Sequence, residues 1–250
     1  MSRPQIAAGN WKMNTDIESG VSLAEQLIEV DVPQNTMVIL APPYTHLSSI
    51  DQIIREKNGF YLASQNMSQH EKGAYTGEIS ASMLKSVGVS HVIIGHSERR
   101  EYFGDTDEII GEKVKSVLDN GLKPILCVGE SLQQRESGNH FDVVAGQLEK
   151  GLANVRRSNV DDVIVAYEPV WAIGTGVTAS PAQAQEIHEF IRLQLEEKFG
   201  QYASAVIPIL YGGSVNAGNA TELFSNPDVD GGLVGGAALK SDDFKEIILA

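Results

Sequence analysis

The chain has 250 residues, 42% of them hydrophobic, a formal net charge of −14 and a single cysteine. The hydrophobic fraction excludes a disordered or fibrous chain, and one cysteine excludes an intrachain disulfide scaffold or a cysteine-rich metal site. The acidic balance argues against nucleic acid and anionic membranes as partners, because both need a concentrated basic patch.

Eight short apolar runs follow one another, and none approaches the roughly 18–20 residues that cross a bilayer. The first has no long hydrophobic stretch before it, so we expect no signal peptide and a cytoplasmic protein. Most runs are rich in Val, Ile and Leu without alternation, which is typical of strands buried on both faces of a parallel sheet. They begin near Ile6, Met37, Phe60, His91, Lys123, Val163, Ile207 and Val229.

Amphipathic helical patterns lie between these runs. A capping-box sequence over residues 15–18 predicts one helix start, Asp105 with Glu108 a second, and Ser180 followed by Pro181 a third. Further helices are predicted near residues 45–57, 79–87, 138–154, 216–225 and 241–249. No Pro/Gly/Ser linker or low-complexity tract divides the chain, so residues 1–250 are predicted to form one domain.

The strand–helix alternation predicts a closed (β/α)8 barrel of eight parallel strands with outer helices. The runs recur about every 32 residues, roughly one strand–helix unit. An open doubly wound sheet is the alternative, since the same alternation permits it. The barrel is favoured because eight units can close without edge strands and the chain length fits.

Three polar residues stand at predicted carboxyl ends of strands, where ligands bind in either fold. They are Lys12, His96 and Glu168, and together on one rim they would form an acid–base site. Each also has a structural interpretation: Lys12 as a solvated lysine and His96 as a hydrogen-bonded core histidine. Glu168 ends the apolar run VIVAY, where a carboxylate is rarely placed without a partner or a chemical task.

Glycine pairs end the last two predicted strands, Gly212–Gly213 before Ser214 and Gly235–Gly236. Consecutive glycines let backbone N–H groups approach an anion closely, and the last strands of such a barrel often hold a phosphate. Ordinary tight turns would explain either pair alone. Both pairs at these positions predict a phosphate site.

The segment Gly174–Ala179 matches the pattern GxGxxA, but we do not interpret it as a dinucleotide site. Its glycines lie several residues past the strand and precede the helix cap at Ser180 instead of opening the helix. Apolar Val170, Trp171 and Ile173 lie in this connection, which predicts a mobile lid, the alternative being a loop packed on the barrel top. The predicted lid comprises Pro169, Val170, Trp171, Ala172, Ile173, Gly174, Thr175 and Gly176.

Five segments in order resemble the triosephosphate isomerase family, and the resemblance covers essentially the whole chain. They are GNWKMN at 9–14, IIGHSERR at 93–100, AYEPVWAIGTG at 166–176, YGGSV at 211–215 and GLVGGAAL at 232–239. The resemblance implies a TIM barrel and an isomerase of glycolysis and gluconeogenesis that needs no metal or cofactor. It would interconvert dihydroxyacetone phosphate and D-glyceraldehyde 3-phosphate through an enediolate.

Two other functions are weighed against this one. A phospho-ligand-binding barrel without turnover would be favoured if Lys12, His96 or Glu168 were missing, and all three are present. Another phosphate-binding barrel enzyme, such as a sugar-phosphate isomerase of amino-acid biosynthesis, would share the glycine pairs but not the WAIGTG segment.

The resemblance also implies roles for individual residues. Glu168 would be the base that moves a proton between two substrate carbons, and His96, in its neutral form, the electrophile, as in the family's own mechanism. Lys12 would stabilise the developing oxyanion and attract the phosphate. Asn10 would orient the substrate, and Glu98 would support the site.

The family's phosphate and lid contacts carry over in the same way. The residues implied to bind the substrate phosphate are Gly174, Ser214, Gly235 and Gly236. Tyr211 would hold the closed lid near Ala179. One residue departs from the pattern: Val177 stands where the family usually has lysine, so the end of the lid is atypical.

The polar loop over residues 65–78 is too long for an ordinary connection. The resemblance implies that it inserts into a partner subunit, with Thr76 approaching that subunit's site. Met13 falls at the same family interface. A homodimer is therefore expected.

Overall fold

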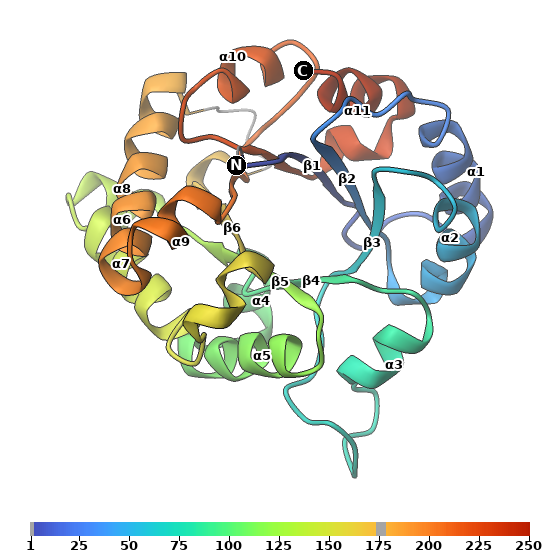
Figure 1. The fold of residues 1–250 in the computed structure, drawn as a ribbon, viewed down its shortest axis with the longest axis horizontal. Coiled ribbons are helices and arrows are strands. Elements are labelled where there is room, and N and C mark those ends of the chain that lie inside the picture. The colour runs from blue at the N-terminus through green and yellow to red at the C-terminus, as the bar shows by residue number, and fades with distance from the viewer. Residues whose placement is uncertain (1–2, 174–178) are drawn as a thin grey trace.

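The strands close into a parallel barrel in which neighbours in sequence are neighbours in space (Figure 1). A computed structural model describes residues 3–173 and 179–250. Because β1 pairs in parallel with both β2 and β8, the open-sheet alternative is wrong. The strands are β1 (Gln5–Asn10), β2 (Thr36–Ala41), β3 (Phe60–Ser64), β4 (His91–Ile94), β5 (Lys123–Val128), β6 (Ile164–Tyr167), β7 (Ile209–Tyr211) and β8 (Gly231–Val234).

Helices surround the barrel and cover its outer face (Figure 1). Within the described part of the chain, no helix is both long and apolar enough to cross a membrane. The α-helices are α1 (Ile17–Leu27), α2 (Leu47–Ile54), α3 (Ala81–Ser86), α4 (Ser97–Phe103), α5 (Asp107–Asp119), α6 (Leu132–Glu136), α7 (His140–Gly151), α8 (Pro181–Phe199), α9 (Gln201–Val206), α10 (Ala220–Phe224) and α11 (Ser241–Ile248). Short 3-10 helices include η1 (Tyr44–His46), η2 (Arg157–Asp162), η3 (Val170–Ala172) and η4 (Gly236–Leu239).

The core has two layers, one on each face of the strands. Alternate side chains of each strand point into the barrel, and their neighbours point outward against the helices. Ile6 and Ala8 of β1 belong to the inner cluster, whereas Ala7 belongs to the outer one. Burial on both faces explains why the strand sequences show no alternation of apolar and polar residues.

The three predicted helix starts can be compared with the caps in the structure. At α8, Ser180 accepts a hydrogen bond from the N–H of Gln183 in a capping box, as predicted. At α1, the cap is Asp16, paired with Ser19, one residue after the predicted start. Thr15 has a positive φ of 70°, so it lacks the extended conformation that an N-cap requires.

The predicted start of α5 at Asp105 is also wrong by one residue. Thr106 caps the helix through its hydroxyl. The Asp105 carboxylate instead forms two ion pairs. Its Oδ2 lies 2.9 Å from Arg99 Nε and 2.8 Å from Lys113 Nζ. Arg99 lies in the preceding helix, α4, and Lys113 lies further along α5. The residues immediately around Asp105 therefore did not reveal these partners.

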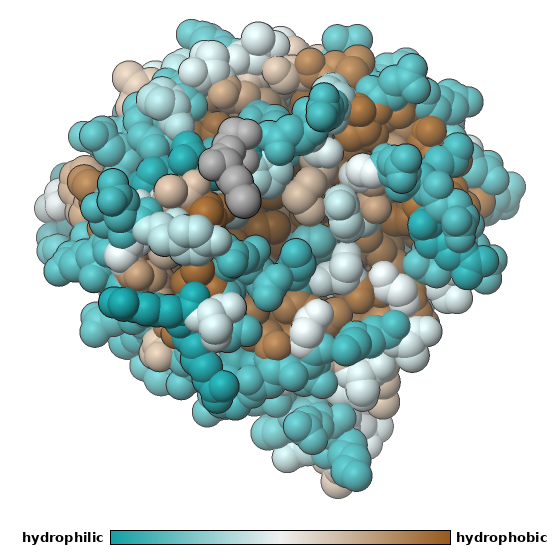
Figure 2. Space-filling view, viewed as in Figure 1, coloured by the Kyte–Doolittle hydropathy of each residue, from teal (hydrophilic) through white to brown (hydrophobic). Residues whose placement is uncertain are grey.

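The loop over residues 65–78 projects from the body between β3 and α3 (Figures 1 and 2). Residues 66–68, near its beginning, are buried, whereas residues 70–78 are exposed. The exposed part therefore contributes little to the core of this chain.

Candidate active site

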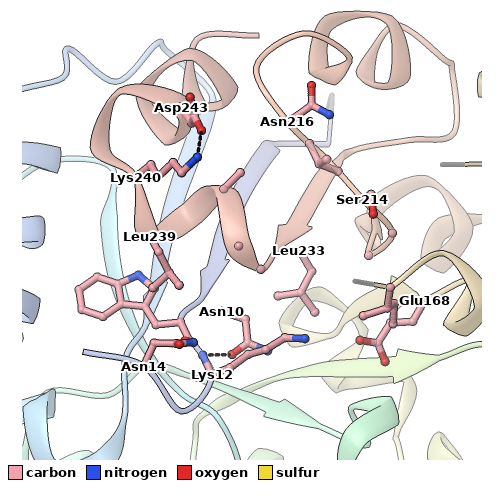
Figure 3. Close-up of a pocket in the computed structure, with 18 of the residues that line it drawn as sticks. Asn10, Lys12, Asn14, Glu168, Ser214, Asn216, Leu233, Leu239, Lys240 and Asp243 are labelled. Atoms are coloured by element: carbon pink, nitrogen blue, oxygen red, sulfur yellow. Dashed lines mark hydrogen bonds and ion pairs between the residues drawn. The ribbon is translucent and has the colours of Figure 1, made fainter. Parts of the chain in front are cut away.

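A cavity of about 560 Å³ opens at the carboxyl ends of the strands. Lys12 and Glu168 point toward one another across it (Figure 3). Residues after β1, β4, β6, β7 and β8 converge there, as the ends of parallel strands must in a closed barrel. The lining includes Asn10, Lys12, His96, Glu168, Gly212, Gly213, Ser214, Gly235 and Gly236.

Glu168 directly follows β6 and is 2% exposed. Its Oε1 lies 3.0 Å from His96 Nε2, and its Oε2 accepts a hydrogen bond of 2.9 Å from the Ser97 N–H. Gly212 leaves room for this side chain, because a Cβ built there would lie 3.0 Å from Glu168 Cγ. The carboxylate is thus buried, hydrogen-bonded at both oxygens and turned toward the end of β4.

His96 stands at the N-terminus of α4, where its Nδ1 accepts a 3.3 Å hydrogen bond from the Glu98 N–H. In a neutral ring the proton is therefore on Nε2, facing Glu168. Burial lowers the pKa of His96, but the charge and hydrogen bond of Glu168, with help from Glu98, outweigh burial and raise it. The helix N-terminus favours the neutral ring, so the raised pKa depends on the carboxylates, Glu168 foremost.

Lys12 follows β1 by two residues and turns its side chain along the cavity. Its Nζ lies 2.6 Å from Glu98 Oε1, with the two side chains 27% and 41% exposed. The side-chain Oδ1 of Asn10 accepts from the Lys12 N–H at 3.0 Å. Gly235 lies close to the same side chain, since a Cβ built there would be 3.5 Å from Lys12 Cε. The ammonium group supplies local positive charge in a strongly acidic protein.

Comparisons with known proteins agree with this geometry. A family model described as triosephosphate isomerase matches residues 5–250. The chain belongs to the triosephosphate isomerase family. Curated proteins of that name from Flavobacterium psychrophilum, at 52% identity, and Bacteroides fragilis, at 50%, each match over 98% of both chains. The one from Porphyromonas gingivalis is 50% identical over 99% of both chains.

The enzyme interconverts dihydroxyacetone phosphate and D-glyceraldehyde 3-phosphate. The alternative of a phospho-ligand-binding barrel without turnover is therefore set aside. A small triose phosphate is the substrate.

The predicted phosphate residues of this isomerase lie at the end of the cavity formed by β7 and β8. Ser214 and both glycine pairs line it, and Gly236 begins η4. Ser214 Oγ donates to Ala172 O at 2.7 Å, which connects this region to the beginning of the lid. Gly174, the fourth predicted phosphate residue, lies outside the described residues.

The described beginning of the predicted lid, Pro169–Ile173, is held by a residue that the sequence analysis missed. Glu130 is fully buried, and its Oε1 accepts hydrogen bonds from Trp171 Nε1 at 2.9 Å and from Tyr167 OH at 3.0 Å. Burial and the neighbouring Glu130 carboxylate raise the pKa of Tyr167 far above its usual value. The only signal in the sequence was a charged residue two positions after the end of β5.

Tyr211 contacts the described residue that resumes the chain after the predicted lid. Its hydroxyl accepts a hydrogen bond of 3.2 Å from the Ala179 N–H, the pairing that the resemblance implied. The predicted lid residues Gly174, Thr175 and Gly176, and the atypical Val177, lie outside the described residues.

The predicted interface residues are at the surface of this chain. Met13 is 97% exposed, and Thr76 is exposed near the end of the projecting loop. Gln65, at the beginning of that loop, donates from Nε2 to Lys12 O at 2.8 Å. This hydrogen bond connects the base of the loop to the backbone of Lys12, a residue that lines the cavity of the same chain.

Proposed function

We propose that Glu168 is the base of the isomerisation. It takes a proton from C1 of dihydroxyacetone phosphate, and the electron pair left behind forms a C1–C2 double bond while the carbonyl becomes an enediolate. His96 donates its Nε2 proton to O2 and recovers one from O1, and Glu168 returns its proton to C2, which gives glyceraldehyde 3-phosphate. Lys12 attracts the substrate phosphate and stabilises the negative charge that develops on oxygen, Asn10 orients the substrate and Glu98 holds Lys12.

The observation that carries the proposal is the meeting of three groups at one cavity. The Glu168 carboxylate and the His96 Nε2 are 3.0 Å apart, and Lys12 reaches the same space (Figure 3). A carbon acid needs a base and an electrophile together, because the enediolate alone is too unstable.

Glu168 must change its contacts before it reaches substrate. Both of its oxygens are occupied, by His96 Nε2 and by the Ser97 N–H. The next residue is Pro169, the first of the lid, so lid closure would carry the carboxylate away from His96 toward the substrate. This movement would also leave His96 in the neutral form that can donate to O2. Closure would exclude water from the enediolate.

Replacement of the base tests the assignment. Glu168→Gln keeps the size and shape of the side chain, and we expect kcat to fall by roughly 10²–10⁴-fold with an unchanged fold. The assay couples the isomerase to a dehydrogenase of glyceraldehyde 3-phosphate or dihydroxyacetone phosphate, in the presence of a metal chelator. Glu189→Gln, an exposed position on α8, is the matched control. A Glu168→Gln enzyme with more than a tenth of the wild-type kcat would refute the role of Glu168.

We further propose that Ser214, Gly235, Gly236 and Gly174 bind the substrate phosphate. Support comes from the lining of the cavity by the first three and from the positive charge of Lys12 beside Gly235. Inorganic phosphate and sulfate should then inhibit competitively, raising the apparent KM without changing kcat. Ser214→Ala should weaken that inhibition, and equal inhibition constants would exclude Ser214 from the site.

A homodimer formed through residues 65–78 is part of the same proposal. Exposed apolar side chains support it, since Met13, Tyr75, Tyr102 and Phe103 are 97%, 45%, 68% and 67% exposed and burying apolar surface against a second copy would be favourable. Thr76 would approach the partner's cavity. Analytical ultracentrifugation should give a dimer for the wild type and a shift toward monomer for Tyr75→Asp, with lower kcat/KM. A wild-type monomer would contradict the proposal.

A cytoplasmic location also stays a prediction. It rests on the single cysteine, which suits a reducing compartment, and on the glycolytic reaction. Cell fractionation with a tagged full-length chain tests it, and recovery of the protein with membranes would contradict it.

A further inference from the structure

The turn that carries Lys12 has a strained backbone. Three described non-glycine residues have a positive φ, and two of them, Lys12 at 54° and Thr15 at 70°, lie three positions apart, the third being Asn35 at 68°. Asparagine tolerates this conformation, but a β-branched threonine is rarely found there, because its Cβ substituents crowd the backbone. Such residues persist only where surrounding contacts hold them, and they gather at functional sites.

The Lys12 end of the turn is held by hydrogen bonds from two neighbours. The Gln65 amide donates to Lys12 O at 2.8 Å and to Ala41 O at 2.9 Å, and Asn10 accepts from the Lys12 N–H (Figure 3). Asn14 then folds back and donates from Nδ2 to Trp11 O at 2.6 Å. None of these contacts explains the conformation of Thr15.

The Thr15 end is held by His46. The imidazole Nε2 lies 3.1 Å from Thr15 Oγ1, and the same hydroxyl donates to Asn14 O. A hydroxyl has one hydrogen, so Thr15 accepts its second bond from the Nε2–H of His46. The other ring nitrogen, Nδ1, then accepts from the Thr45 hydroxyl at 2.7 Å. Both nitrogens of His46 are engaged, and its tautomer is fixed.

His46 is itself tightly enclosed. The residue is 2% exposed. A Cβ built on Gly20 of α1 would lie 2.5 Å from His46 Cδ2 and 3.3 Å from Trp11 Cζ3. The imidazole is thus packed closely against α1, beside the indole of the residue that precedes Lys12. A side chain packed in this way can hold the turn rigidly.

We propose that His46 is a positioning residue for Lys12. By holding Thr15 in the left-handed conformation, it fixes the turn over residues 11–15 and thereby the location of the Lys12 ammonium group in the cavity. The inference rests on the substrate-binding role proposed above for Lys12. A lysine has a long flexible side chain, so its reach depends on where its backbone is held, and small misplacements of a binding group are costly in catalysis.

Two substitutions of Thr15 test the inference, because they differ by one methyl group. Thr15→Ala removes the hydroxyl but keeps the Cβ that disfavours positive φ, whereas Thr15→Gly removes both and adopts that φ freely. We expect Thr15→Ala to raise KM about tenfold, the effect of one ordinary hydrogen bond, with a smaller change in kcat. Thr15→Gly should stay within about twofold of wild type in both constants. Equal KM values for the two variants would overturn the proposal.

His46→Phe adds a second, independent test. It should raise KM as Thr15→Ala does, and the double variant His46→Phe/Thr15→Gly should recover most of the loss, because glycine no longer needs the imidazole. If adding Thr15→Gly to His46→Phe does not lower the raised KM, His46 contributes only through its packing and not by holding Thr15. If His46→Phe fails to fold, the two Thr15 variants still decide the question.

Controls separate this inference from the role of Lys12 and from general strain. Asn35→Ala and Asn35→Gly alter the third positive-φ position, which does not line the cavity, so they should change the unfolding midpoint and leave KM unchanged. Lys12→Met should raise KM strongly. If it does not, the proposed role of Lys12 fails. If it does while Thr15→Ala has no effect, only the inference about His46 fails.

Discussion

His188 is a fully buried imidazole whose protonation should limit the stability of the enzyme in acid. Burial lowers its pKa from 6.5 to about 4. Its Nδ1 is 3.2 Å from Asp228 O, to which the neutral ring can donate. The ring packs near Tyr167 and Tyr211, with centroids 5.9 and 6.3 Å away, and Tyr211 in turn accepts the hydrogen bond from the Ala179 N–H after the predicted lid. Protonating His188 would therefore disturb both the core and the support of the lid.

The size and sign of the effect follow from the two pKa values. In the unfolded chain His188 takes up a proton below pH 6.5, whereas in the folded chain it does so only below about pH 4. The contribution of the neutral His188 ring to the free energy of unfolding is thus complete above pH 6.5. It is lost as the pH falls from 6.5 toward 4. Between pH 7.5 and 4.5, linkage gives a loss of about 2–3 kcal/mol from this one residue.

Urea unfolding at pH 7.5 and 4.5, at one protein concentration, measures this loss. We expect the wild type to lose about 2–3 kcal/mol more than His188→Gln over that interval, since glutamine can still donate to Asp228 O but does not titrate. Gln201→Ala, at the exposed first residue of α9, should keep the wild-type pH dependence. Equal pH dependence in the wild type and His188→Gln would refute the reasoning.

Three further predictions concern the active site. Glu168→Gln should lower the pKa of His96, because it removes the main group that raises it; an NMR titration that shows no decrease would contradict this. Tyr211→Phe removes the hydrogen bond to the Ala179 N–H and should lower kcat by about fivefold to tenfold, and stopped-flow measurements should locate the loss in a lid-dependent step. Gly212→Ala places a Cβ 3.0 Å from Glu168 Cγ and should lower kcat while costing about 1–3 kcal/mol of stability; unchanged kcat would show that Glu168 does not depend on this space.

The barrel and the general location of the site could be predicted from the chain alone. Strands buried on both faces produce apolar runs, and their regular spacing reports the strand–helix repeat. Because strands of one barrel run parallel, the residues that follow them meet at one rim. The positions of Lys12, His96 and Glu168 after apolar runs were therefore sufficient to place them in one cavity.

Helix boundaries could be predicted only where the cap is local. Ser180 and Gln183 cap α8 with atoms three residues apart, and the sequence contains both partners. Asp105 looks equally suitable as a cap, but Lys113 and Arg99 compete for its carboxylate. That competition depends on how the helices pack and cannot be read from neighbouring residues.

The sequence by itself determined the fold, the reaction and the residues at the strand ends, because each depends on periodic burial or on motifs in which the residues are close in the chain. Only the tertiary structure decided what holds those residues in place. Glu130 meets Trp171 across 41 positions, and His46 meets Thr15 across 31. Contacts of that kind arise when distant segments pack together, and hydrogen-bond geometry between them leaves no periodic pattern in the chain.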